Sequence, residues 1–109
     1  MTLRVDTQCR AFQTAIEVLA RPWTALILNV LQEGPLRFSE IGDRLPRLGD
    51  KMLSARLKEL EQRGVLVREV AVGPPVRVSY ELTERGRAFN DLARAIERWG
   101  AELLEGEGG

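Results

Sequence analysis

The stretch "LGDKMLSARLKELEQRG", residues 48–64, decides how this chain folds because it has the periodicity of a short amphipathic helix. Its leucines, Leu53, Leu57 and Leu60, recur every three or four residues and form one apolar stripe. The other side carries small or hydrogen-bonding side chains, namely Lys51, Ser54, Ala55, Lys58 and Gln62. That side is either the solvated face of a helix or a surface that contacts another molecule.

The segments on both sides of this helix favour a winged helix-turn-helix. Before it, "SEIGDRLP" (residues 39–46) predicts a short helix with Ser39 as its N-cap. After it, Gly64 is expected to end the helix, and residues 65–82 alternate like a two-stranded hairpin that is broken at "GPP". Two short helices joined by a tight turn and followed by a hairpin are typical of winged helix-turn-helix domains.

The remaining segments predict three further helices and one short strand. Residues 9–20 and 22–33 are expected to be helices, the second with Pro22 in its first turn and apolar nearly all round, as a central core helix is. Residues 36–38 suit a small edge strand, and Thr83 is expected to cap a last long helix. We therefore expect a mainly α fold with a small β-hairpin (α+β). One winged helix-turn-helix domain with extra N- and C-terminal dimerisation helices would span residues 1–104, followed by a flexible acidic and glycine-rich tail over residues 105–109.

Composition and charge limit the functions that this chain can have. The 109 residues, 44% of them hydrophobic, suit one domain with a modest core. No apolar run approaches the roughly 20 residues that span a bilayer, so we expect a cytoplasmic protein without membrane contact. The formal net charge is zero, yet residues 44–68 hold seven bases and three acids, a net charge of +4, and residues 97–109 have a net charge of −3. Local basic charge favours phosphate contact.

Several short motifs, taken in order, resemble the HxlR-type bacterial winged-helix transcriptional regulators over residues 9–99. They are Trp23-Thr24 with "LIL" (26–28), Gly34 followed by "RFSEI" (37–41), "KMLSARLKELEQRGVLVRE" (51–69), "PPVRVSYELTERG" (74–86) and Trp99. The resemblance implies a dimeric DNA-binding regulator whose N-terminal and C-terminal helices form the dimer interface. It also implies that an N-terminal cysteine can sense electrophiles or oxidants. Two positions depart from the family pattern, because Arg21-Pro22 replaces Gly-Lys and Leu48-Gly49 replaces Ile-Ser.

The side chains expected to contact DNA lie on the quoted helix and on the hairpin. Lysine donates to guanine acceptors, serine serves several bases and alanine can touch a thymine methyl group, so the base-contacting candidates are Lys51, Ser54, Ala55 and Lys58. Arg68, Pro75 and Arg77 belong to the wing, which can follow the phosphate backbone or enter the minor groove. Arg37 meets either a phosphate or a buried carboxylate, and Arg56, on the flank of the leucine stripe, is expected to pair with an acid.

A second apolar seam runs along the last helix. Its residues step by three and four positions and are Phe89, Leu92, Ile96, Trp99 and Leu103. The seam could pack inside the chain, but residues 22–33 already supply a core helix, which favours a homodimer interface. Phe12 and Ile16 of the first helix are expected to join this interface.

Cys9 is the single cysteine of the chain. We expect it just before the first helix and beside Arg10, where a helix N-terminus and a cation both favour the thiolate. The alternatives are a redox or electrophile sensor and an inert thiol. A sensor could form a disulfide only with a partner subunit or with a small thiol.

The function expected from these features is that of a DNA-binding regulator, acting as a repressor through a homodimer on a pseudo-palindromic operator in double-stranded DNA. It could respond to an electrophile or another small-molecule effector. The alternative is a winged-helix module that binds another protein and never meets DNA. No enzyme, cofactor or metal site is expected, because the chain lacks histidine and has no known catalytic or nucleotide-binding motif.

Overall fold

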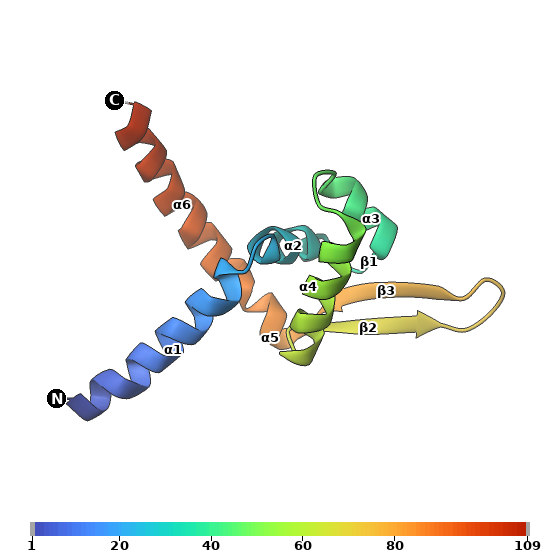
Figure 1. The fold of residues 1–109 in the computed structure, drawn as a ribbon, viewed down its shortest axis with the longest axis horizontal. Coiled ribbons are helices and arrows are strands. Elements are labelled where there is room, and N and C mark those ends of the chain that lie inside the picture. Colours follow the sequence, from blue (N-terminus) through green and yellow to red (C-terminus); the bar gives the residue numbers. More distant parts are fainter. Residues whose placement is uncertain (1, 109) are drawn as a thin grey trace.

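The computed structural model describes the backbone of residues 2–108 and the side chains of residues 8–106. The helices are α1 (Thr2–Ala20), α2 (Thr24–Val30), α3 (Phe38–Arg44), α4 (Asp50–Gln62), α5 (Glu84–Arg87) and α6 (Phe89–Gly108). A 3₁₀ turn, η1 (Leu31–Glu33), follows α2, and the strands are β1 (Leu36–Arg37), β2 (Leu66–Ala71) and β3 (Arg77–Leu82). The expected mainly helical winged helix-turn-helix fold is confirmed (Figure 1).

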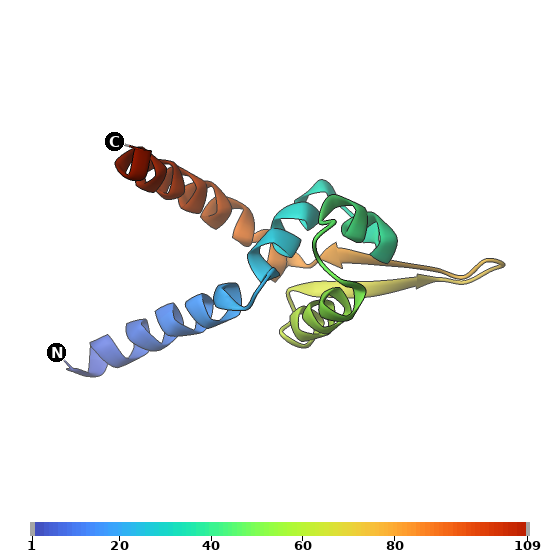
Figure 2. The ribbon, with the colours of Figure 1, turned by 45° about the horizontal axis from the view of Figure 1, so that its top comes forward.

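Two long helices extend away from the body of the molecule. Figure 1 and Figure 2 show α1 and α6 as diverging arms, with the β2–β3 hairpin projecting on the opposite side. The chain bends by 82° between residues 8–20 and 24–33, and within this bend Trp23 has a φ of 73°. Non-glycine residues rarely adopt this left-handed conformation. Trp23 is thus the residue at which the backbone turns from α1 into α2. No single helix among residues 2–108 is long and apolar enough to cross a membrane.

The core lies where α2, α3, α4 and the sheet meet. Leu53, Leu57 and Leu60 of α4 are almost fully buried, as the stripe in the sequence predicted. They pack in one cluster with residues from the other elements, namely Ile27, Leu28, Leu31, Leu36, Ile41, Leu48, Leu66 and Leu82. The predicted central role of the second helix is confirmed by Ile27 and Leu28.

The sheet has three antiparallel strands in the order β1-β3-β2. Leu36 of β1 lies opposite Tyr80, and the hairpin pairs run from Leu66 opposite Leu82 to Ala71 opposite Arg77. The predicted edge strand and hairpin are therefore present. Phe38, expected at the end of that strand, instead begins α3.

Gly64 ends α4 as the sequence predicted. Its φ of 75° is a left-handed value that suits glycine. The Val65 N–H donates to the Leu60 carbonyl at 3.1 Å, and the Gly64 N–H donates to the Glu61 carbonyl at 3.0 Å. These two bonds form a Schellman motif, which satisfies the last carbonyls of the helix and turns the chain into β2.

The N-termini of two helices differ from expectation. α2 begins at Thr24, so Pro22 lies in the preceding turn. The N-cap of α3 is Arg37 rather than Ser39, and the carboxylate of Glu40 accepts a 2.7 Å hydrogen bond from the Arg37 N–H. A glutamate at the third helical position satisfies the N–H of the N-cap residue in this way in a capping box.

The two ends of the chain also differ from expectation. α1 begins at Thr2 instead of near Cys9. Thr83 caps a helix, but that helix is the four-residue α5, in which the Thr83 hydroxyl accepts a bond from the Gly86 N–H. α6 follows as a separate helix and continues to Gly108, so residues 105–108, expected as a tail, have helical backbone.

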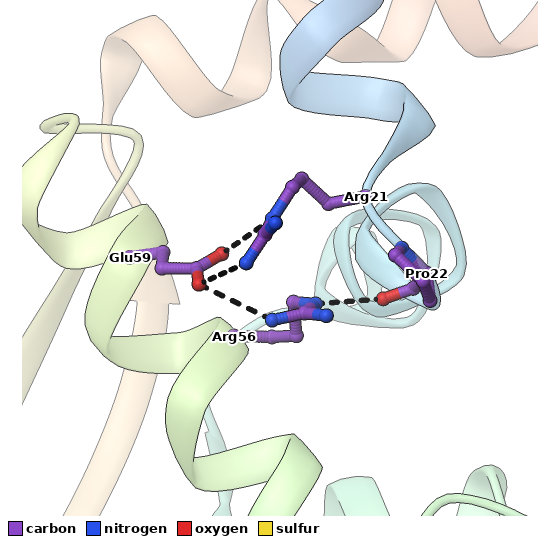
Figure 3. Close-up of polar contacts among 4 residues, drawn as sticks. All are labelled: Arg21, Pro22, Arg56 and Glu59. Atoms are coloured by element: carbon purple, nitrogen blue, oxygen red, sulfur yellow. Dashed lines mark hydrogen bonds and ion pairs between the residues drawn. The ribbon is translucent and has the colours of Figure 1, made fainter.

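A buried arginine fastens α4 to the joint between α1 and α2. Arg56 is only 6% exposed, and its Nε donates to the Pro22 carbonyl at 2.8 Å. Its Nη1 donates to Glu59 Oε2 at 3.2 Å, and Arg21 Nη2 donates to the same oxygen at 2.8 Å (Figure 3). We call these four residues the Arg56 bridge. The predicted pairing of Arg56 with an acid is confirmed.

The charges of the Arg56 bridge reinforce one another. The hydrogen bond from Arg21 holds the pKa of Glu59 below its usual value, and the charges of Arg21 and Arg56 lower it further. Because the folded-state pKa is depressed, the contribution of Glu59 to stability is present above its unfolded-state pKa. It is lost as the pH falls through the folded-state pKa.

The close packing of α5 on Val65, just before β2, and on the end of β3 leads to a first prediction. A Cβ at Gly86 would collide with the Val65 carbonyl oxygen and come within 3.1 Å of Leu82 Cδ2. Gly86→Ala should therefore lower the free energy of unfolding by about 3 kcal/mol or more, as measured by urea denaturation. Gly42→Ala in α3, where a Cβ meets nothing within 4 Å, should instead stabilise the protein by about 0.5–1 kcal/mol. Equal effects of the two substitutions would contradict this packing.

A second prediction concerns the Arg56 bridge. Arg56→Met should lower the free energy of unfolding by about 1–3 kcal/mol, because the Pro22 carbonyl loses its buried donor. Lys58→Met, on the exposed side of the same helix, should change it by less than about 0.5 kcal/mol. If thermal and urea denaturation give the same stability for both variants, the bridge does not hold α4 in place.

Candidate nucleic-acid interface

The polar side of α4 is open to solvent. Lys51, Ser54, Ala55 and Lys58 are all exposed, and we call them the exposed row. Their spacing of three, one and three residues puts them on one side of the helix, away from the buried leucines. The helix is thus seated in the core by one face and presents donors and a methyl group on the other.

The start of α4 has no side-chain cap. Gly49 is the N-cap residue and contributes no side-chain hydrogen bond, and Asp50, which could have replaced it, lies in the first turn without capping. Asp50 still places a negative charge at the positive end of the helix dipole. The backbone N–H groups of this first turn therefore have no side-chain cap, and they lie at the same end of the helix as Lys51.

The arginines around the helix-turn-helix differ in whether they form ion pairs within the chain. Arg44 Nε contacts Glu33 Oε2 at 2.9 Å, so it is held within the chain. Arg37 is exposed and has no ion pair among the described residues, which argues against the buried carboxylate that was one of its two expected partners. Arg47, in the turn between α3 and α4, is exposed as well. Arg47 counts toward the local positive charge of residues 44–68, but it is not among the DNA contacts predicted from the sequence. Its position in the turn just before α4 was a signal that could have identified it.

The wing carries its cations along the hairpin and not at its tip. Arg68 and Arg77 are exposed, and their ladder partners are Tyr80 and Ala71. Because side chains alternate along a strand, the two arginines point to opposite faces of the hairpin. The tip itself, from Val72 to Val76, contains no charged residue, and Val72 is 96% exposed. Pro75 lies in this exposed tip.

The arms carry exposed apolar side chains. Phe12 is 70% exposed and Trp99 63% exposed, and the same description applies to Ile16, Leu92, Ile96, Leu103 and Leu104. Phe89 differs from the rest of its predicted seam, because it is half-buried and packs against the core of its own chain. The sequence missed Leu104, which continues the apolar surface by one residue beyond Leu103.

Cys9 is exposed, but its surroundings are not those predicted. Because α1 begins at Thr2, Cys9 lies well inside the helix and not at its N-terminus. The prediction that Cys9 lies at a helix N-terminus is therefore wrong. Arg10 remains its neighbour in the sequence, and it too is exposed.

Comparison with known proteins matches this geometry to one family. The family described as HxlR-like helix-turn-helix matches residues 18–107. The HTH-type transcriptional regulator YodB of Bacillus subtilis is 39% identical over 100 residues, which cover 92% of this chain and 89% of YodB. YvaP, an uncharacterised HTH-type transcriptional regulator of the same organism, is 42% identical over 97 residues, which cover 89% of this chain and 90% of YvaP.

Solved structures give the same result. The reduced form of YodB superposes with a TM-score of 0.80 at 40% identity and covers 85% of this chain and 91% of YodB. YodB has also been solved in a quinone-bound form, with a TM-score of 0.74 at 37% identity over 84% of this chain and 96% of YodB. The redox regulator HypR in its oxidised form has a TM-score of 0.77 at 29% identity, over 84% of this chain and 95% of HypR. The chain belongs to the HxlR-like helix-turn-helix family of DNA-binding transcriptional regulators.

Proposed function

We propose that this regulator is a homodimeric repressor that inserts α4 of each subunit into the major groove of a pseudo-palindromic operator. The observation that carries the proposal is the exposed row, which projects from a helix whose other face is buried. The B-DNA major groove is about 12 Å wide and admits one helix, whose donors then reach base edges. In this role Lys51, Ser54, Ala55 and Lys58 contact bases.

The surrounding cations would hold the protein on the DNA backbone. Arg37, Arg68 and Arg77 are exposed and free of ion pairs among the described residues, so they can contact phosphates. Arg47 joins them from the turn before α4. Pro75 and the apolar tip of the wing would lie against the sugar edges of the adjacent minor groove, where apolar side chains can pack.

The dimer is supported by the apolar arms. Exposed apolar surface of this extent on two long helices is typical of an interface. The seam would consist of Phe12 and Ile16 from α1 with Phe89, Leu92, Ile96, Trp99 and Leu103 from α6, with Phe89 at its inner end. Two-fold symmetry would place the two α4 helices about one DNA turn, roughly 34 Å, apart. A dimer bound over a promoter blocks transcription simply by occupying the DNA. Repression in the cytoplasm would therefore require no additional binding surface on the protein.

Redox or electrophile control is the second part of the proposal. Quinone-bound YodB and the redox regulator HypR are relatives of this chain. Cys9 is exposed on α1, where a quinone ring can reach its sulfur. The thiol would add to the ring to form a carbon–sulfur bond, and the quinone would be reduced to a hydroquinone that keeps the thiol proton. An added group on α1 would disturb the arms and, through them, DNA binding.

A test of the base-reading assignment starts from operator fragments selected from genomic DNA by the purified protein. Lys51→Ala with Ser54→Ala should weaken operator binding at least about 30-fold in gel shifts, because each base contact contributes about 1–3 kcal/mol. As a control, Arg94→Ala removes a positive charge from α6, outside the exposed row and the wing, and should leave the affinity for the operator unchanged. Wild-type binding should also weaken steeply with salt. Undiminished affinity of the double variant would refute the assignment, and failure to select any DNA would favour a protein-binding module.

The sensor assignment gives a separate prediction. Treatment of the wild-type protein with a quinone should add the mass of one quinone per chain and release the operator. Cys9→Ser should bind the operator as tightly as the reduced wild-type protein, gain no mass and keep its DNA after the same treatment. Mass spectrometry and gel shifts measure the two effects. Release of DNA from Cys9→Ser would place the sensor elsewhere.

A further inference from the structure

Three arginines from distant parts of the chain line one hollow. Arg10 lies on α1, Arg63 follows the last residue of α4, and Arg85 lies on α5. The hollow has a volume of about 810 Å³, and its lining contains no acidic residue. None of the three arginines forms an ion pair among the described residues. Three positive charges therefore face one space without a counter-charge from its own walls.

The arginines are differently constrained. Arg85 Nη1 donates to the Arg63 carbonyl at 3.0 Å, which fixes one end of its guanidinium and leaves its other N–H groups available. The side chains of Arg10 and Arg63 have no hydrogen bond among the described residues and can adjust to a bound group. Guanidinium groups bind carboxylates through two parallel hydrogen bonds. One fixed arginine and two adjustable ones are suited to hold such an anion.

An apolar hollow continues from the cationic one. It has a volume of about 260 Å³ and shares Ala15, Val18, Val65 and Arg85 with the first. Its other walls are Leu19, Leu28, Gly86, Ala88, Phe89 and Leu92. Together the two hollows form one groove, the cationic groove, with a charged end and an apolar end. The cationic hollow alone, at about 810 Å³, lies within the range of small-molecule sites, roughly 300–1,000 Å³.

We propose that the cationic groove binds a small organic anion with an apolar body, such as an aromatic carboxylate. The carboxylate would lie between Arg10, Arg63 and Arg85, and the ring would enter the apolar end beside Leu28 and Phe89. The charge of the walls selects an anion, and the apolar end selects against inorganic phosphate or sulfate.

The faces of α1 separate this groove from the proposed dimer seam. At 100° per residue, the groove-lining residues of α1 and the seam residues Phe12 and Ile16 point roughly 140° apart. A second copy that packs on Phe12 and Ile16 therefore leaves the arginine end open, although Phe89 and Leu92, at the apolar end, border both surfaces. A small molecule is thus the occupant that fits the groove.

A ligand in this groove would contact both an arm and the recognition helix. It would touch α1 through Arg10 and the end of α4 through Arg63, which is the C-cap residue of that helix. Ligand binding could then set the angle between the arm and α4 without any change at Cys9. This regulatory consequence rests on the proposed function, whereas binding of the anion does not.

The test uses 2-naphthoate as the probe and titration calorimetry with the 109-residue protein. Naphthoate should bind once per chain, and neutral 2-naphthalenemethanol should bind at least 10-fold more weakly. Arg10→Gln with Arg63→Gln should weaken naphthoate binding at least 10-fold. The matched control, Arg94→Gln with Arg98→Gln, removes two arginines from α6 outside the groove and should bind like the wild-type protein.

Other outcomes would overturn the proposal. Absence of naphthoate binding to the wild-type protein at millimolar concentration, or equal binding to both double variants, would refute the site. If Arg10→Gln with Arg63→Gln shifts the mass in sedimentation equilibrium while the control does not, a second copy occupies the groove. Circular dichroism confirms that each variant is folded. Lys51→Ala with Ser54→Ala should still bind naphthoate, so a failure of the DNA-binding proposal is distinguishable from a failure of this one.

Discussion

Burial of the Arg56 guanidinium under the joint between α1 and α2 is the contact on which the position of α4 depends. The leucine stripe alone is non-directional, because apolar contacts tolerate small rotations of a helix. Hydrogen bonds from Arg56 to the Pro22 carbonyl and to Glu59 are directional, and a buried charge left without them would be costly. The leucines therefore determine which face of α4 is buried, while the Arg56 bridge fixes how the helix is positioned against the joint between α1 and α2.

The same bridge joins α4 to the first of the two arms. Arg21 and Pro22 follow α1 directly, so a shift of α1 moves two of the four residues that hold α4. These two residues stand where the family pattern has Gly-Lys. In this chain the position supplies an ion pair to Glu59 in addition to the backbone carbonyl. A displacement of α1 can thus reach α4 through a few polar atoms.

Local patterns predicted most of the fold, and non-local contacts explain what they missed. The leucine periodicity, Gly64 and the alternating hairpin each act over a few residues, so the sequence was sufficient for them. The first turns of α1 lack apolar periodicity, and its early start moved Cys9 away from the expected helix end. Thr83 is a good cap, but no local signal distinguishes four-residue α5 from the start of α6. The groove of Arg10, Arg63 and Arg85 exists only because folding brings three distant residues together.

The distribution of arginines also changes the meaning of the basic segment. Residues 44–68 have a net charge of +4, which suggested contact with phosphate. Within the folded chain, however, Arg44 pairs with Glu33, Arg56 is buried in its bridge, and Arg63 faces the cationic groove. Only Arg47, Lys51, Lys58 and Arg68 of the seven bases remain exposed and outside these contacts, and all four lie on the helix-turn-helix or the wing. Three of the seven bases in the segment are thus engaged within the fold or face the cationic groove, and phosphate contact by the other four stays a prediction.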